Sequence, residues 1–268
     1  MISPHVESTS DKGNEKAPFC METCRRVFFC LFFSGIIRKN VFTQLFVPQT
    51  SQSSQDRRAE PEVRLAVSSA QSACGMEDFM KLLIVVDMQN DFVTGSLGTK
   101  EAQAIVENVV CKIKETPAEQ IYVTQDTHPE QYLQTKEGLH LPVAHCIEGT
   151  NGHCLCPAVE QALKEKQVDA ARKIQKPTFG SMELIEKLRS DEKIVTDSNL
   201  QIELVGLCTG ICVLSNAILC KAAFPEADVI VDAAACACVT PASHDTALAA
   251  MKLCQIEVEK EGKEPWRN

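Results

Sequence analysis

Short apolar runs recur along the chain after residue 80, and four of them read as strands: 81–87, 120–126, 200–207 and 227–236. They are rich in Val, Ile, Leu and Ala and do not alternate strictly with polar residues. This pattern is typical of strands that are buried on both faces of a parallel sheet. The first two runs end in an acid, Asp87 and Asp126.

Helical periodicity fills the intervals between these runs. Ile105, Val109 and Ile113 share one face of the segment 102–115. Helices are predicted at 102–115, 157–165, 181–190, 212–224 and 243–254, and a long loop at 127–152. Strands that alternate with helices predict an α/β fold with a doubly wound, mostly parallel sheet and helices on both faces. Ligands bind such sheets beyond the carboxyl ends of the strands, where Asp87, Asp126 and the turn after Leu207 fall.

Three residues near these ends could carry chemistry, and each has a plainer alternative. Asp87 leaves a buried strand, where desolvation would raise its pKa and make it a base, or it caps a turn. Lys176 precedes Pro177, which favours extended backbone and an inward side chain, although most lysines lie in water. Cys212 stands near a helix start, where the helix dipole favours a thiolate and free N–H groups could bind an oxyanion, or it is a structural cysteine.

Residues 1–79 differ in composition from the rest of the chain. They contain nine basic and nine acidic residues, so the net charge of −9 arises from residues 80–268, and such an acidic body argues against nucleic-acid binding. The apolar run 27–37 is shorter than the roughly 20 residues that span a bilayer, and basic residues follow it. We expect 1–79 to be a poorly ordered extension, or an over-extended start ahead of Met80, with a targeting peptide as the alternative. A chain that begins at Met80 should then fold and keep its activity.

The fourteen cysteines lie mostly inside apolar runs, as Cys111, Cys220, Cys236 and Cys254 do. Buried free cysteine behaves as a small hydrophobic residue. Without a convincing secretion signal, a reducing cytoplasm is the simpler setting.

Three motifs taken together are more specific than any one residue. The segments VVDMQNDF, KPTFGS and GLCTGICV stand in an order and at separations that resemble the isochorismatase-like cysteine hydrolase superfamily over about residues 81–258. The resemblance implies a catalytic triad of Asp87, Lys176 and Cys212, an oxyanion hole from the backbone of Cys208 and Cys212, and a cis peptide at Leu207–Cys208. It makes residues 80–268 the cysteine hydrolase domain. Because true isochorismatases lack the nucleophilic cysteine, Cys212 points to the amide-hydrolysing branch.

The loop 127–152 is similar to the metal-binding loop of nicotinamidases. Asp126 and His128 stand in D-x-H spacing, and imidazole with carboxylate suits Zn²⁺, Mn²⁺ or Fe²⁺. The resemblance implies His145 as a third ligand and Glu137 as a fourth. The chain departs from many nicotinamidases in having Gln134 where they have a histidine. The alternative is that these polar residues only decorate a solvated loop.

The resemblance also implies a substrate pocket and an activity. Phe92 corresponds to an aromatic residue against the substrate ring, and Leu141 to a position where many nicotinamidases have another. The implied reaction is nicotinamide deamidation, a step of NAD salvage. The partner is then a small amide, with no nucleic acid or membrane and with a homo-oligomer left open. Two alternatives remain: an amidase for another small amide or ureido substrate, and a non-catalytic thiol or metal-binding protein with Cys208 and Cys212 as a redox pair.

Overall fold

The computed structural model describes residues 80–267, and the predicted extension 1–79 lies outside them. Six parallel strands form one sheet in the order β3-β2-β1-β4-β5-β6. The strands are β1 (Lys81–Val86), β2 (Ile121–Asp126), β3 (Lys173–Lys176), β4 (Gln201–Leu207), β5 (Asp228–Ala237) and β6 (Glu257–Glu259). The α/β class and the parallel sheet predicted from the sequence are confirmed.

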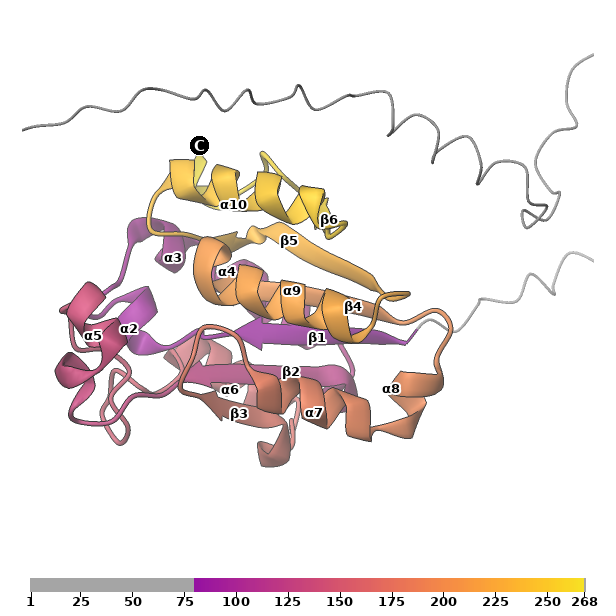
Figure 1. Ribbon diagram of the computed structural model, residues 1–268, viewed down its shortest axis with the longest axis horizontal. Coiled ribbons are helices and arrows are strands. Elements are labelled where there is room, and N and C mark those ends of the chain that lie inside the picture. The colour runs from indigo at the N-terminus through magenta and orange to yellow at the C-terminus, as the bar shows by residue number, and fades with distance from the viewer. Residues whose placement is uncertain (1–79, 268) are drawn as a thin grey trace, which may run out of the picture. The chain divides into compact units, whose positions relative to one another are not determined.

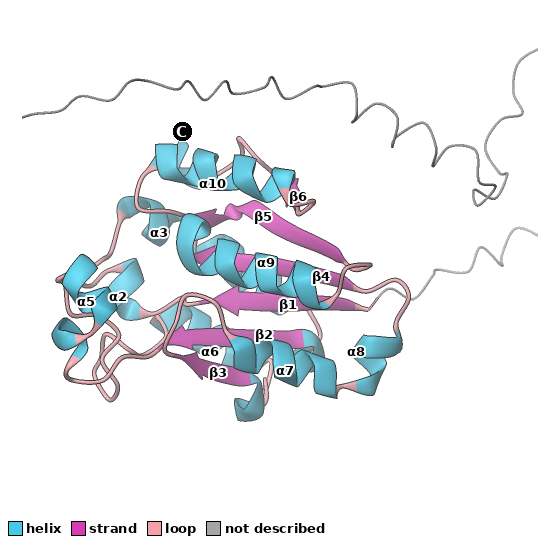
Figure 2. Cartoon of the chain, viewed as in Figure 1, coloured by secondary structure: helices cyan, strands magenta, loops and turns pink. Residues whose placement is uncertain are grey.

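Helices cover both faces of the sheet (Figure 1, Figure 2). The α-helices are α2 (Asn90–Val93), α3 (Lys100–Ala104), α4 (Val106–Glu115), α5 (Lys136–His140), α6 (Pro157–Glu165), α7 (Met182–Ser190), α8 (Glu192–Thr196), α9 (Leu214–Ala223) and α10 (Pro241–Leu253). Short 3₁₀ turns are η1 (Ala118–Gln120), η2 (Tyr132–Gln134), η3 (Ala170–Arg172) and η5 (Pro265–Arg267), and η4 (Thr209–Val213) is a π-helical turn. No helix among the described residues is long and apolar enough to cross a membrane.

Alternation along β1 divides the core between the two faces. Leu82, Ile84 and Val86 pack with α7, α8, α9 and α10, whereas Leu83 and Val85 pack with α4 and α6. All five residues are at most 1% exposed. The apolar run in β1 is continuous because helices cover both faces of this central strand, as the sequence indicates.

The strand order has a switch point between β1 and β4. The chain adds β2 and β3 on one side of β1 and then returns to add β4, β5 and β6 on the other. Connections diverge at such a point and leave a crevice at the carboxyl ends of the strands. In Figure 1 these ends point toward α2 and α5.

Several elements differ from the sequence prediction, and three differences concern the surroundings of the strands and the turn after β4. The segment 102–115 is divided at Ile105 into the end of α3 and all of α4. The segment 212–224 begins its helical course earlier, at Thr209, in the turn η4. The strands β3 and β6 were not predicted, because KIQK and EVE each contain a single apolar residue.

Candidate active site

Asp87 lies at the carboxyl end of β1 and is fully buried. Its backbone is in the left-handed region at φ 48°, which Asp tolerates better than most residues. Its N–H donates to the Thr124 carbonyl at 3.1 Å, and the Thr124 hydroxyl donates to Oδ1 at 2.7 Å. The other carboxylate oxygen, Oδ2, forms an ion pair with the Lys176 ammonium at 2.6 Å. Burial raises the pKa of Asp87 although Lys176 opposes the shift, which is the direction expected for a carboxylate at the end of a buried strand.

Lys176 ends β3 and reaches the same point from the other side of β2. The register pairs it with Asp126, the last residue of β2. Its Nζ lies 2.6 Å from Asp87 Oδ2, 3.3 Å from Asp126 Oδ1 and 3.4 Å from Cys212 Sγ. Burial acts to lower the pKa of Lys176, but Asp87, Cys212 and Asp126 outweigh it and raise the pKa, so the ammonium stays charged. The inward orientation predicted for Lys176 is confirmed, and its side chain is 1% exposed.

Cys212 is held by the turn that follows β4. Gly206 has φ 118°, and a Cβ there would lie 2.1 Å from the Val86 carbonyl oxygen, so only glycine fits beside β1. The Leu207–Cys208 peptide is cis, as the resemblance implies. The π turn η4 then places Cys212 beside Lys176, and its carbonyl accepts the Asn216 amide at 2.8 Å. The first π-type bond runs from the Val213 N–H to the Cys208 carbonyl, so the Cys212 N–H belongs to the start of the helical segment.

One expectation about Cys212 is wrong. The helix start was expected to favour its thiolate, but burial and the neighbouring Asp87 raise the pKa of the thiol well above its ordinary value, and Lys176 offsets them only in part. The side chain is 5% exposed, which explains why desolvation dominates over the helix dipole. The free protein therefore favours the neutral thiol at Cys212.

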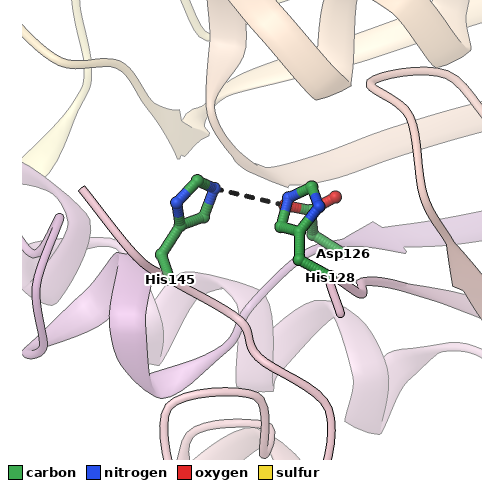
Figure 3. Close-up of side chains that lie close together, drawn as sticks. All are labelled: Asp126, His128 and His145. Atoms are coloured by element: carbon green, nitrogen blue, oxygen red, sulfur yellow. Dashed lines mark hydrogen bonds and ion pairs between the residues drawn. The ribbon is translucent and has the colours of Figure 1, made fainter. Parts of the chain in front are cut away.

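Three of the four predicted metal ligands come together at the end of β2 (Figure 3). One donor atom from each of Asp126, His128 and His145 lies within 4.8 Å of the others, and all three residues are buried. Asp126 Oδ2 lies 2.9 Å from His128 Nε2 and 3.5 Å from His145 Nε2. Glu137 lies at the margin of this cluster, with Oε1 3.7 Å from His128 Nε2.

The loop after β2 is folded so that His145 returns to His128. The His128 N–H donates to the Cys146 carbonyl at 3.0 Å, and the Glu148 N–H donates to the His128 carbonyl at 2.9 Å. His145 Nδ1 is 2.8 Å from the Val143 carbonyl oxygen, so Nδ1 carries the proton and Nε2 is left as a ligand. Burial opposes ionisation of Asp126, but His128, His145 and Lys176 outweigh it and lower its pKa. Two imidazole nitrogens and a carboxylate oxygen in a buried cluster are a donor set that fits a divalent transition metal.

A cavity of about 210 Å³ opens above these groups. Phe92 and Leu141 line it, as the resemblance implies, and the Phe92 ring centroid lies 5.4 Å from that of His145. The lining is mostly apolar: Phe92, Leu97, Thr99, Ala102, Asp126, Glu137, Leu141, His145, Phe179, Leu207, Cys208, Ile211, Cys212, Cys238 and Val239. A cavity below the 300–1,000 Å³ of drug-sized ligands suits a small molecule with an apolar body.

Two features of the site were not predicted from the sequence. Gln89 is fully buried, and its side chain accepts the Asp126 N–H at 2.7 Å and donates to the Asp126 carbonyl at 2.8 Å, which fixes the end of β2. Phe179 lines the cavity from the loop after β3, within the quoted KPTFGS segment. Gln89 could have been suspected from its position two residues after Asp87. Nothing in the sequence, however, indicates that its amide pairs with the backbone of Asp126.

Comparison with known proteins places the chain in a family. A family model described as the isochorismatase domain matches residues 81–260. The chain belongs to the isochorismatase family. It is therefore an isochorismatase-like hydrolase, and the family predicted from the sequence is confirmed.

Solved structures of nicotinamidases and pyrazinamidases are similar to this chain. A nicotinamidase from Bacillus subtilis is 26% identical, with a TM-score of 0.56 over 67% of this chain and 98% of the other. A pyrazinamidase/nicotinamidase from Streptococcus mutans is 25% identical, with a TM-score of 0.57 over 66% of this chain and 99% of the other. A pyrazinamidase of Pyrococcus horikoshii in complex with zinc shares the fold at 24% identity and a TM-score of 0.53, over 67% of this chain and 98% of the other. Comparison with curated proteins found no match.

Proposed function

We propose that this hydrolase converts nicotinamide to nicotinate and ammonia through a thioester on Cys212. The observation that supports the proposal most directly is the position of the Lys176 ammonium, 2.6 Å from Asp87 and 3.4 Å from Cys212, a residue that lines a small apolar cavity. A thiol, a base and a fixed cation in mutual contact are the requirements of nucleophilic catalysis on an acyl carbon. The similarity to nicotinamidases at 25–26% identity supports the choice of substrate.

In the first half-reaction, the carboxylate of Asp87 takes the proton of the Cys212 thiol. The raised pKa of Asp87 brings its carboxyl group closer to the Cys212 thiol in proton affinity. Lys176 stabilises the thiolate by its charge as the sulfur attacks the carboxamide carbon. The N–H groups of Cys208 and Cys212 donate to the oxyanion that forms. The C–N bond then breaks, and ammonia leaves with the proton that Asp87 held.

In the second half-reaction, water replaces ammonia at the same position. Asp87 accepts a proton from the water molecule while the oxygen of that water attacks the thioester carbon. The C–S bond breaks, nicotinate is released, and the proton returns to the Cys212 sulfur. Lys176 remains charged throughout, so each half-reaction begins and ends with the same total charge on the three residues.

The donor set of Asp126, His128 and His145 fits a divalent ion, with zinc as our first choice and manganese or iron as alternatives. Glu137 is proposed as a further ligand, with a contact weaker than the other three because its carboxylate lies 3.7 Å from the nearest histidine nitrogen. Bound there, such an ion would act as a Lewis acid toward a ring nitrogen and hold the substrate in the cavity. The residues on this side of the site then orient the ring, while Asp87, Lys176 and Cys212 perform the chemistry.

The direct experiment measures ammonia release from nicotinamide by the purified full chain, with and without a chelator. We expect turnover that the chelator reduces and that Cys212→Ala abolishes. A second candidate is an amidase for another small amide or ureido substrate, because Leu141, at a position where many nicotinamidases have an aromatic residue, is aliphatic and 37% exposed. Turnover of such an amide but not of nicotinamide would favour that candidate. A Cys208–Cys212 disulfide without any turnover would favour a redox protein instead.

A further inference from the structure

A chain of buried polar side chains lies outside the catalytic and metal-binding groups. The Thr209 hydroxyl is 2.8 Å from His244 Nδ1, and His244 Nε2 is 3.2 Å from Glu264 Oε1. Thr209 and His244 are fully buried and Glu264 is 1% exposed. Buried polar groups of this kind are costly unless every one of them is paired, so the chain indicates a specific requirement at this position.

The donor and the acceptor can be assigned in each of these two hydrogen bonds. Burial acts to raise the pKa of Glu264, but hydrogen bonds from Arg267 and the Gly262 N–H outweigh it and lower the pKa, so Glu264 is a carboxylate that only accepts. His244 Nε2 therefore carries a proton and donates to Glu264. Burial lowers the pKa of His244 although Glu264 opposes it, so the ring is neutral and Nδ1 accepts the Thr209 hydroxyl proton.

Of the three hydrogen-bonded residues, Thr209 is the one that lies next to the reacting groups along the sequence. It begins η4, directly after Cys208 and three residues before Cys212. The helix α10, which holds His244, packs against η4, and the C-terminal turn η5 packs against α3 and places Trp266 edge-on to the His244 ring at 5.1 Å. The C-terminal residues thus contact the nucleophile turn through one line of hydrogen bonds.

We infer that Thr209 and His244 are positioning residues, which hold the nucleophile turn so that the N–H groups of Cys208 and Cys212 face the oxyanion. The assignment rests on the proposed function for the identity of the reacting groups. It predicts that loss of the Thr209 hydroxyl affects the transition state and leaves the bound ring unaffected, because the ring contacts the cavity and the metal-binding side of the site.

The test compares three variants of the full chain. Thr209→Val removes the hydroxyl and keeps the shape of the side chain, and Thr209→Ser keeps the hydroxyl. Thr246→Val is the matched control, since that exposed hydroxyl on α10 donates only to the Ala242 carbonyl, at 2.9 Å. With nicotinamide as substrate, we expect Thr209→Val to lower kcat about tenfold with KM within about twofold, and Thr209→Ser to recover most of kcat. Thr246→Val should equal wild type.

A second measurement does not require turnover. Cys212 can add to the carbonyl carbon of pyridine-3-carbaldehyde, with the thiol proton moving to the aldehyde oxygen, which then occupies the oxyanion position. We expect calorimetry to show a Kd about tenfold weaker for Thr209→Val and unchanged for Thr246→Val. In addition, the double variant Thr209→Val with His244→Gln should lose no more affinity for the aldehyde than the weaker-binding single variant, because the two residues act through one hydrogen bond.

A wild-type Kd for the aldehyde in Thr209→Val, or a loss that appears in thermal stability and KM but not in kcat, would overturn the assignment. Wild-type protein that binds the aldehyde but releases no ammonia from nicotinamide would instead contradict the proposed substrate. The aldehyde comparison of Thr209→Val with Thr246→Val still decides the role of Thr209 in that case.

Discussion

Removing the Lys176 charge should destabilise the protein by an amount that depends on pH. Lys176→Met keeps most of the side-chain length and deletes the ammonium between Asp87, which is fully buried, and Asp126, which is 3% exposed. Breaking a buried ion pair from one side costs about 3–5 kcal/mol, because the partner charge is left without compensation. Since domains are stable by only about 5–15 kcal/mol, this loss is a large fraction of the whole.

The pH dependence has a definite sign. Burial already raises the pKa of Asp87, and Lys176 opposes that shift, so its removal raises the pKa further above the unfolded value. The folded variant then binds this proton more tightly than the unfolded chain does, and its stability increases as the pH falls. The loss in free energy of unfolding relative to wild type should be largest near pH 8 and should shrink as the pH falls through the raised pKa of Asp87.

The matched control is Lys173→Met on the same strand. Lys173 pairs with Glu160 at 2.9 Å, but the two side chains are 23% and 29% exposed, and partly exposed pairs contribute about 0–1 kcal/mol. Urea unfolding of the full chain, followed by circular dichroism at pH 5.5 and pH 8, gives the free energies of unfolding. A chelator is present throughout, because a bound cation at Asp126 would add stability by mass action. Equal deficits for the two variants, or a Lys176→Met deficit that is the same at both pH values, would refute this account of the buried charges.

Three further outcomes follow from the same geometry. Cys212→Ala should abolish ammonia release with the fold intact by circular dichroism, whereas Cys220→Ala, in the core below the site, should keep turnover. His145→Ala should lose stoichiometric metal by mass spectrometry, while Glu137→Ala should weaken metal affinity several-fold and raise KM; full retention of affinity would remove Glu137 from the site. Asp87→Asn should abolish turnover yet speed alkylation of Cys212 by iodoacetamide near neutral pH, because the carboxylate that raises the pKa of the thiol is gone; slower alkylation would contradict that cause.

The central strands were predictable from the sequence because burial on both faces leaves a direct trace in composition. β1, β2, β4 and β5 each lie within one residue of a predicted run. β3 has no such apolar run, since Lys173 and Gln175 face outward and the buried Lys176 is itself a charged residue. That strand exists because it pairs with β2, and a pairing between residues about fifty positions apart has no local signal.

The candidate site follows the same division. Asp87 follows β1 and the turn that carries Cys212 follows β4, so the parallel sheet was enough to predict both at the same edge. Lys176 ends β3, a strand that was not predicted, and its place beside them was implied only by the family resemblance. Their protonation was not predictable in the same way, because the pKa of Cys212 is set by burial and by Asp87 rather than by the helix start on which the thiolate was expected.

The residues that hold the site in place are harder to find from sequence than the residues that react. Gln89 acts through backbone atoms of Asp126, and Thr209 acts through a histidine and a glutamate that come 35 and 55 residues later. A hydroxyl or amide at such a position looks like any other polar residue in a turn until its partner is known. The partners come from the last helix and the C-terminal turn, so the geometry of a nucleophile at the end of β4 depends on how the final segment of the domain packs. Substitutions that break this line of hydrogen bonds, at His244 in α10 or at Glu264 just before η5, should therefore change kcat without any contact with substrate.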